Sequence, residues 1–176
     1  MRGVQTNFVG FATIDAIIKT NDAERAIAMS QVETVVKILG VDKDLNQPST
    51  TVDLPQRLTA IVREGLPPSA ADRIAEYYEL SRQQVSELMG VSVRTLERHQ
   101  KDNKPLSPVQ SDRLLRYARI AARAEEVFED TQIARNWLKR PNQALGGEIP
   151  LNLLDTEAGV EQVDDVLTRI KYGVYS

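Results

Sequence analysis

Apolar residues recur along most of the chain at the three- and four-residue spacing of an amphipathic helix. The first clear stripe lies in Asp22–Leu39 and ends before Gly40, a residue type that commonly follows a helix. Residues 157–172 carry a second stripe. No segment alternates convincingly between apolar and polar residues as a half-buried strand does, so the pattern predicts an all-α fold. The stripes consist of Ile27, Val32, Val35, Val36 and Leu39 in the first segment and of Val160, Val163, Leu167 and Ile170 in the second.

Capping residues and helix breakers divide the rest of the chain into further helices. The strongest start signals are Ser81 with Gln84 and Ser107 with Gln110, because a serine followed three residues later by a glutamine forms a capping box. Polar residues 42–51 are expected to form a linker. Helices are predicted over about residues 53–63 (capped by Asp53), 69–79, 81–89, 93–101, 108–128 and 131–138, with a loop over residues 140–150.

The stretch around Gly90 joins two predicted helices and has the features of a helix–turn–helix. Gly90 supplies the positive φ that a tight turn needs, and Ser92 is placed to cap the second helix. The second helix leaves polar residues on or near its outer face, where arginine can pair with guanine and hydroxyls can contact phosphate. Five apolar residues are expected to fix the angle between the helices, namely Val85, Leu88, Val91, Val93 and Leu96; the candidate DNA contacts are Arg94, Thr95, Arg98, His99 and Lys101.

The alternative to DNA binding is a solvated charged surface, since Glu97 and Asp102 dilute the positive charge of this helix. The chain has a net charge of −3, but the charge is unevenly distributed. Residues 94–123 hold eight Arg and Lys against three Asp and Glu, whereas residues 124–176 hold five against ten. A basic middle followed by an acidic end indicates that one part faces phosphates and another a different partner.

Four arginines recur at helical spacing along the segment expected to form the long helix over residues 108–128. They either clamp phosphate or an acidic partner, or they pair with neighbouring carboxylates. Four carboxylates in residues 157–165 are expected either to form a solvated helix face or to offer acidic contacts to a basic partner. The arginines are Arg113, Arg116, Arg119 and Arg123, and the carboxylates are Glu157, Glu161, Asp164 and Asp165.

The composition argues against an enzyme, a metalloprotein and a membrane protein. The chain has no cysteine and one histidine, His99, so we expect no catalytic residues, no metal and no cofactor. Gly146 and Gly147 lack the strand and the Lys–Ser/Thr of a phosphate-binding loop, which favours a simple tight turn. Phe128 and Trp137 are expected to pack inward. No apolar run approaches the roughly 18 residues of a membrane span, and we expect a cytoplasmic protein.

The C-terminal half combines short motifs that are quite specific as a set, above all a final helix followed by Gly and an apolar–aromatic tail. The motifs are Ser107–Pro108, Ser111–Asp112–Arg113–Leu114, Glu126–Val127–Phe128, Trp137–Leu138, Pro141–Asn142, Leu145–Gly146–Gly147, Pro150–Leu151, Leu154–Asp155–Thr156, Gly159 and Arg169–Ile170–Lys171–Tyr172–Gly173–Val174–Tyr175. In these motifs the chain resembles the Xre-type antitoxins of RES–Xre toxin–antitoxin modules, the Xre/ParS toxin-binding family. The resemblance covers about residues 53–176.

This resemblance implies an antitoxin with two tasks. A helix–turn–helix over residues 53–105 represses the module's own promoter. A C-terminal domain over residues 106–176 binds a RES-domain toxin that degrades NAD⁺ and covers its active site. Residues 1–52 are an extension and linker without a counterpart in the family. The alternative is a simple helix–turn–helix regulator with a C-terminal dimerisation domain.

The final residues are the expected toxin contacts. Gly173 is suited to end the last helix, so that the following residues and a free carboxylate plug a pocket built for an anionic dinucleotide. A frayed terminus is the alternative. The expected toxin-binding residues are Arg169, Lys171, Tyr172, Gly173, Val174, Tyr175 and Ser176.

The expected partners are the cognate RES-domain toxin and operator DNA, in a homo-oligomer or a toxin-bridged hetero-oligomer, with no membrane. The stripe over Ile27–Leu39 is a candidate for self-association. His99 departs from the family, which often has a basic residue at this position. We therefore expect weak DNA binding by a single chain and better repression by toxin-bridged assemblies.

Overall fold

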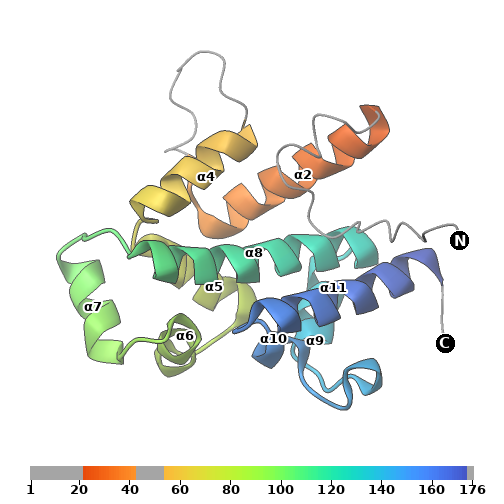
Figure 1. The fold of residues 1–176 in the computed structure, drawn as a ribbon. Helices are drawn as coiled ribbons and strands as arrows, with labels where there is room; N and C mark the ends of the chain where they lie inside the picture. Colours follow the sequence, from red (N-terminus) through yellow and green to blue (C-terminus); the bar gives the residue numbers. More distant parts are fainter. Residues whose placement is uncertain (1–21, 43–53, 174–176) are drawn as a thin grey trace, which may run out of the picture.

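The computed structural model describes residues 22–42 and 54–173, and within these ranges the chain is helical and contains no strand (Figure 1). The predicted all-α fold is confirmed. None of the helices in these ranges has the length and apolar content needed to cross a membrane. The elements are α2 (Asp22–Leu39), α4 (Leu54–Glu64), α5 (Ser69–Tyr78), α6 (Arg82–Met89), α7 (Val93–Lys101), α8 (Pro108–Phe128), α9 (Thr131–Leu138), the 3₁₀ helix η1 (Gln143–Leu145), α10 (Pro150–Leu153) and α11 (Glu157–Tyr172).

The helix ends follow the capping residues of the sequence. Both capping boxes are formed, with Ser81 and Ser107 each accepting a hydrogen bond from the backbone N–H three residues later. The proposed cap Asp53 lies outside the described residues. The expected loop over residues 140–150 was incomplete as a prediction, because it contains η1 and the first residue of α10. Elements of three and four residues are too short to show a helical period.

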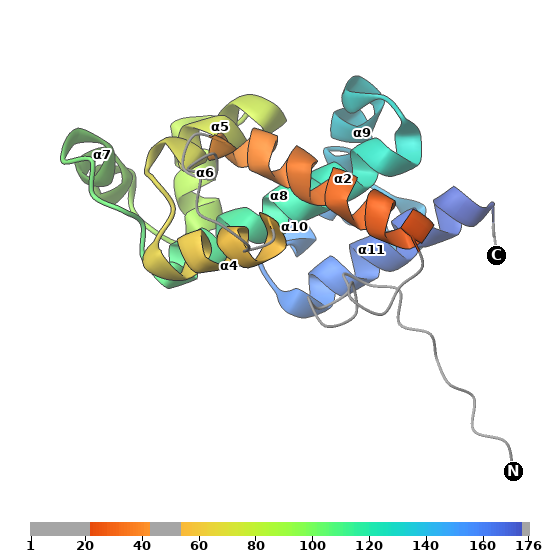
Figure 2. The same ribbon diagram turned by 90° about the horizontal axis from the view of Figure 1, so that it is seen from above.

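Helix α8 occupies the centre of the molecule. It contacts α2, α4, α5, α6, α9 and α11, and α2 and α11 lie along different sides of it (Figures 1 and 2). Its buried alanines let these neighbours approach closely, since the distance between packed helices depends on the side chains at the contact. The buried alanines are Ala118, Ala121, Ala122 and Ala124.

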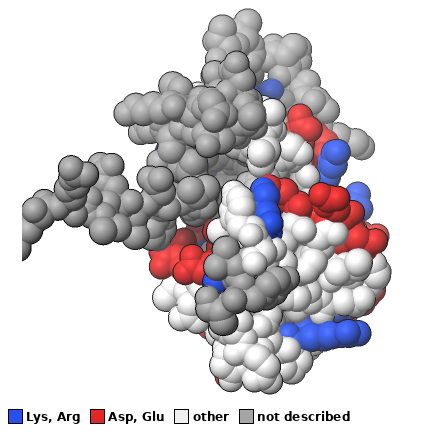
Figure 3. All heavy atoms as spheres, turned by 90° about the vertical axis from the view of Figure 1, so that its right-hand side faces the viewer, with Lys and Arg blue, Asp and Glu red and all other residues white. Residues whose placement is uncertain are grey.

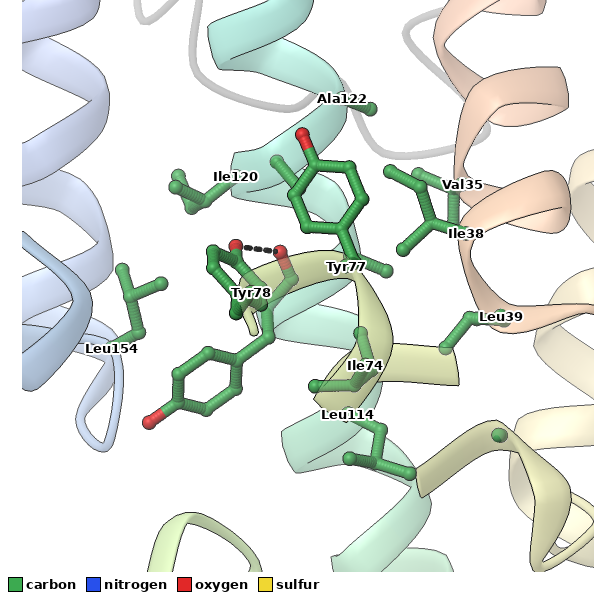
Figure 4. Packing of buried hydrophobic residues seen from close by; sticks show 14 of the residues in the cluster. Val35, Ile38, Leu39, Ile74, Tyr77, Tyr78, Leu114, Ile120, Ala122 and Leu154 are labelled. Carbon is green, nitrogen blue, oxygen red and sulfur yellow. Dashed lines mark hydrogen bonds between the residues drawn. The ribbon is translucent and has the colours of Figure 1, made fainter. Parts of the chain in front are cut away.

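Two consecutive tyrosines connect α5 to α8 inside the core. The fully buried Tyr78 donates a hydrogen bond of 2.9 Å from its hydroxyl to the carbonyl oxygen of Tyr117 (Figure 4). Its ring meets the ring of Tyr77 edge to face, with centroids 4.9 Å apart. Tyr77 in turn donates 2.9 Å to the carboxylate of Glu125. Burial raises the pKa of Tyr78, so that its hydroxyl stays protonated and continues to donate.

The apolar stripe of α2 packs into the same core. Val35, Ile38 and Leu39 are buried beside Tyr77 and Ile74 (Figure 4). The expectation that the stripe over Ile27–Leu39 serves self-association was therefore wrong for most of its length. A stripe pattern shows that a helix has a partner, but it does not show whether that partner belongs to the same chain.

Phe128 and Trp137 lie at the margin of the core. Both are half-buried and pack on the buried cluster, with ring centroids 5.7 Å apart. Gly146 and Gly147 form the expected tight turn at φ of 69° and 86°. The N–H of Gly147 closes the turn on the carbonyl oxygen of Asn142 at 2.9 Å.

Gly159 is required by a close approach between α10 and α11. A Cβ at this position would overlap the carbonyl oxygen of Leu153 and lie 2.8 Å from its carbonyl carbon. In an ordinary helix, glycine to alanine is stabilising by roughly 0.5–1 kcal/mol. We expect Gly159→Ala to reverse that sign and to lower the free energy of unfolding by about 1–3 kcal/mol, because backbone must shift to accept the methyl group.

Urea unfolding followed by circular dichroism measures this effect. Ala158→Ser adds one heavy atom at the neighbouring exposed position and is the matched control, with an expected change within about 0.5 kcal/mol. A stabilised Gly159→Ala variant would contradict the packing described here.

Candidate functional site

A three-residue turn joins α6 to α7. Gly90 adopts a φ of 68°, and its N–H and that of Val91 bond to the carbonyl oxygens of Glu87 and Ser86, both at 2.9 Å. The hydroxyl of Ser92 then accepts the N–H of Thr95 at 3.1 Å and starts α7. The geometry is that of a helix–turn–helix. Of the five apolar residues expected to fix it, Val85 and Leu96 are buried, whereas Leu88, Val91 and Val93 are half-buried.

The predicted DNA contacts fall into two groups on α7. Arg94, Arg98 and Lys101 are exposed, and no ion pair occupies them within the described part of the chain. Their spacings of four and three residues place them on one side of the helix. Thr95 and His99 are half-buried: the Thr95 hydroxyl lies 2.8 Å from that of Ser92 and the His99 Nδ1 lies 3.1 Å from the Lys104 carbonyl oxygen.

The acidic residue inside this face is itself paired. The Glu97 carboxylate lies 3.6 Å from the guanidinium of Arg82 on α6, and both side chains are more than half exposed. Gln100, on the same helix, donates a hydrogen bond of 2.7 Å to Asp72 on α5. The dilution of positive charge seen in the sequence is therefore partly cancelled by a neighbouring helix.

The arginine row of α8 does not form a single exposed clamp. Arg116 lies 3.3 Å from the carboxylate of Asp112, with most of its side chain covered. Burial lowers the pKa of Arg119, although the nearby carboxylate of Glu157 opposes this. Arg113 lies against the helix–turn–helix, where its guanidinium occupies the space that a Cβ of Gly90 would need. Pairing and packing inside the chain account for these residues.

The fourth arginine, Arg123, is buried in an ion-pair network between α8 and α11. Its Nε lies 3.3 Å from Asp164, its Nη1 lies 2.8 Å from Glu126, and its Nη2 donates 3.1 Å to the hydroxyl of Thr168. Burial raises the pKa of Asp164, although Arg123 opposes the rise. The expected solvated acidic face was therefore wrong at Asp164, which faces α8; Asp165 is exposed.

The expected toxin contacts lie at the end of α11. Gly173 caps the helix at a φ of 65°, as predicted, and the aromatic side chain of Tyr172 stands 66% exposed. Arg169 is exposed, with its Nε 3.4 Å from the carbonyl oxygen of Asp165. Lys171 instead pairs with Glu126 on α8. Three of the predicted residues, Val174, Tyr175 and Ser176, lie outside the described residues.

An acidic cleft of about 350 Å³ opens between α2 and the end of α8. Figure 3 shows acidic side chains gathered on this end of the molecule. The exposed basic helix α7 lies at the opposite end of α8 from the last turn of α11 (Figure 1). The cleft is lined by Ile27, Ser30, Gln31, Thr34, Ala122, Glu125, Glu126, Glu129, Asp130 and Thr131.

The sequence predicted no contact for Gln31 or Glu126, although Glu126 belongs to one of the family motifs. Glu126 joins α8 to α11, and Gln31 joins α2 to Glu126. The residues in contact are separated by 95 positions for Gln31 and Glu126 and by 45 for Glu126 and Lys171. Local periodicity carries no signal for pairs so far apart.

Comparison with known proteins shows which family the chain belongs to. Residues 57–119 match the Antitoxin Xre-like helix-turn-helix domain, and residues 123–173 match the Antitoxin Xre/MbcA/ParS C-terminal toxin-binding domain. An Antitoxin Xre from Photorhabdus laumondii is 31% identical over 120 residues, which cover 68% of this chain and 81% of that protein. The chain belongs to the Xre antitoxin family.

Other relatives extend the comparison. An Antitoxin Xre from Pseudomonas putida is 37% identical over 83 residues, or 47% of this chain and 52% of that protein. A protein from Sphingobium sp. named Prs ADP-ribosylating antitoxin is 25% identical over 125 residues, or 66% of this chain and 79% of its own. The two matched domains are a helix-turn-helix domain and a toxin-binding domain. They imply a DNA partner and a toxin partner.

The positive φ of Gly90 in this Xre antitoxin allows a prediction about substitutions there. The left-handed conformation costs an alanine roughly 1–2 kcal/mol, whereas asparagine adopts it more readily. We expect Gly90→Ala to lower the free energy of unfolding by about 1–2 kcal/mol and Gly90→Asn to lower it by less.

Chemical unfolding of both variants and the parent chain tests the ranking. Moving Arg113 aside is inexpensive because only the flexible end of its side chain is involved, and Arg113→Ala in the Gly90→Ala background should restore little stability. Full recovery in that double variant would show that crowding, and not the backbone conformation, selects glycine.

Proposed function

We propose that this Xre antitoxin neutralises a RES-domain, NAD⁺-degrading toxin and represses its own operon. The observation that carries the proposal is the separation of two surfaces along α8. Exposed cations of α7 lie at one end of the molecule and the last turn of α11 lies at the other (Figure 1). This separation supports the proposal that one chain holds DNA and a toxin at the same time.

The toxin-binding arm is proposed to work through the residues that follow α11. Gly173 ends α11, and Val174–Tyr175–Ser176 follow it in the sequence. In the proposed complex, Tyr175 stacks where an aromatic base of the dinucleotide would lie, and the adjacent apolar and polar groups fill the pocket. Exposed Tyr172 extends the proposed contact, since aromatic residues are enriched in protein–protein interfaces.

The similarity to a Prs ADP-ribosylating antitoxin favours a second toxin chemistry. A toxin that transfers ADP-ribose also requires a pocket for a dinucleotide such as NAD⁺. Residues 174–176 could fill the dinucleotide pocket of either kind of toxin. The reaction catalysed by the isolated toxin distinguishes NAD⁺ degradation from ADP-ribose transfer. Release of free nicotinamide without modified protein is the outcome expected for the RES toxin.

The DNA-binding arm is proposed to act in pairs. Three exposed cations on α7 give few phosphate or base contacts, so binding by a single chain is weak and sensitive to salt. Two helix–turn–helix units held one or more DNA turns apart bind with a raised effective concentration. We therefore infer that toxin-bridged assemblies bind the operator more tightly than free antitoxin does.

Loss of the tail should separate the two activities. We expect deletion of residues 174–176 to weaken toxin binding by at least tenfold, on the order of 1.4 kcal/mol, because the plug is removed. Binding of a single chain to operator DNA should stay within about twofold, since α7 is at the other end of α8. Toxin affinity is measured by calorimetry and operator affinity by gel shift without toxin.

The comparison chain for the truncation carries Ser176→Ala, which keeps all three tail residues in place and should bind toxin as the intact chain does. Equal toxin affinity for the truncated and intact chains would refute the plug. Absence of any toxin binding by the intact chain would instead favour a simple regulator whose C-terminal half dimerises.

Removal of the α7 cations should have the opposite effect. We expect Arg94→Ala with Arg98→Ala to weaken operator binding by roughly tenfold to a hundredfold and to make it less dependent on salt, because two charged contacts are lost. Toxin affinity should not change. Gel shifts at several salt concentrations and toxin calorimetry provide the two readouts.

Arg140→Ala with Arg169→Ala removes the same charge from the opposite half and serves as the control for operator binding. If this pair weakened operator binding as much as the α7 pair, net charge and not the recognition helix would explain the effect.

A further inference from the structure

Helix α2 lies outside both matched domains, yet it reaches the end of the molecule where the last turn of α11 lies. Its Gln31 donates a hydrogen bond to the carboxylate of Glu126 near the end of α8. The same carboxylate accepts hydrogen bonds from Arg123, at 2.8 Å, and from Lys171 in the last turn of α11. Glu126 therefore joins three helices that are far apart in the sequence.

The chemistry of Glu126 suits this role. Partial burial by itself raises the pKa of Glu126, but the hydrogen bonds from Lys171, Gln31 and Arg123 outweigh it and hold the pKa below its ordinary value. The carboxylate is ionised at neutral pH and offers its oxygens to all three donors. Charge-assisted hydrogen bonds of this kind are stronger than neutral ones.

Arg123 and Glu126 of α8 bind side chains along one side of α11. Arg123, which pairs with Glu126, also bonds to Asp164 and Thr168. On α11, Asp164, Thr168 and Lys171 are spaced by four and three residues. One side of the last two turns of α11 therefore faces α8. The final fixed point, Lys171, lies two residues before Gly173, where the helix ends.

We propose that Gln31 and Glu126 are positioning residues for toxin binding, which act through Lys171 on the orientation of the last turn of α11. The inference rests on the proposed function. It changes the role of Lys171 from an expected toxin contact to an internal support, because its ammonium group is held by Glu126. It also gives a role in partner binding to α2, which lies outside both matched domains.

The test measures whether the effects of two substitutions on toxin affinity are additive. Glu126→Gln keeps the shape of the side chain and removes its charge. Lys171→Met keeps the aliphatic part of the side chain and removes the ammonium group. Toxin that co-purifies with the tagged full-length antitoxin is isolated, and its affinity for each variant is measured by calorimetry. We expect each single variant to bind about tenfold more weakly, and the double variant to bind no more weakly than either.

Two further variants and two controls separate positioning from general damage. Gln31→Ala should weaken toxin binding by several-fold, and Lys171→Arg should retain the parent affinity. Glu33→Gln and Glu129→Gln neutralise exposed carboxylates on α2 and just after α8, and should have no effect. Operator affinity of all variants should stay within about twofold of the parent value, which a general loss of folding would not allow.

If the loss of toxin affinity in the double variant equals the product of the two single losses, the residues act independently. Lys171 would then contact the toxin directly, and the proposal would be overturned. Parent-like affinity of Glu126→Gln would overturn it as well. If the parent antitoxin itself binds no toxin, the proposed function fails and the inference with it, whereas a binding parent with unaffected variants rejects the inference alone.

Discussion

Close packing around α8 is the constraint on which the rest of this structure depends. In the described ranges, helices from both matched domains and α2 contact this one helix, and its buried alanines allow them to lie close on several sides. Because both matched domains include parts of α8, they are not independent bodies joined by a linker. The distance between the exposed cations of α7 and the end of α11 is therefore set by a continuous helix.

This arrangement places different physical demands on the two ends of α8. At its start, Arg113 packs against the turn of the helix–turn–helix while the α7 cations remain exposed. At its other end, Arg123 and Glu126 pair with side chains of α11. Arginine is thus exposed on α7, where we propose that it contacts DNA, and buried on α8, where it holds two helices together. Removing charges from water costs free energy, so these buried ion pairs are weak evidence for added stability.

Local signals in the sequence predicted the helices well. Capping boxes at Ser81 and Ser107 set helix starts through contacts only three residues long, and Gly90 and Gly173 mark ends through their own backbone conformation. Burial of Asp164 was not predictable in this way, because its partner Arg123 lies 41 residues earlier in the chain.

The candidate sites were predictable to different degrees for the same reason. The α7 residues share one short helix, so periodicity alone placed Arg94, Arg98 and Lys101 on an exposed side. The inward pairing of Lys171 depends on Glu126 and on Gln31 from α2, which only the tertiary fold brings together. The resemblance to a family supplied the expectation of a toxin but could not supply the role of a helix outside the matched domains.

Hydrogen–deuterium exchange of the full-length antitoxin tests most directly whether its two partners use opposite ends of α8. The chain is compared alone, with operator DNA, and with the toxin that co-purifies with it. The account predicts that DNA protects residues 81–101 and that toxin protects residues 157–176. Toxin protection confined to residues 81–101, with the end of α11 unchanged, would contradict it.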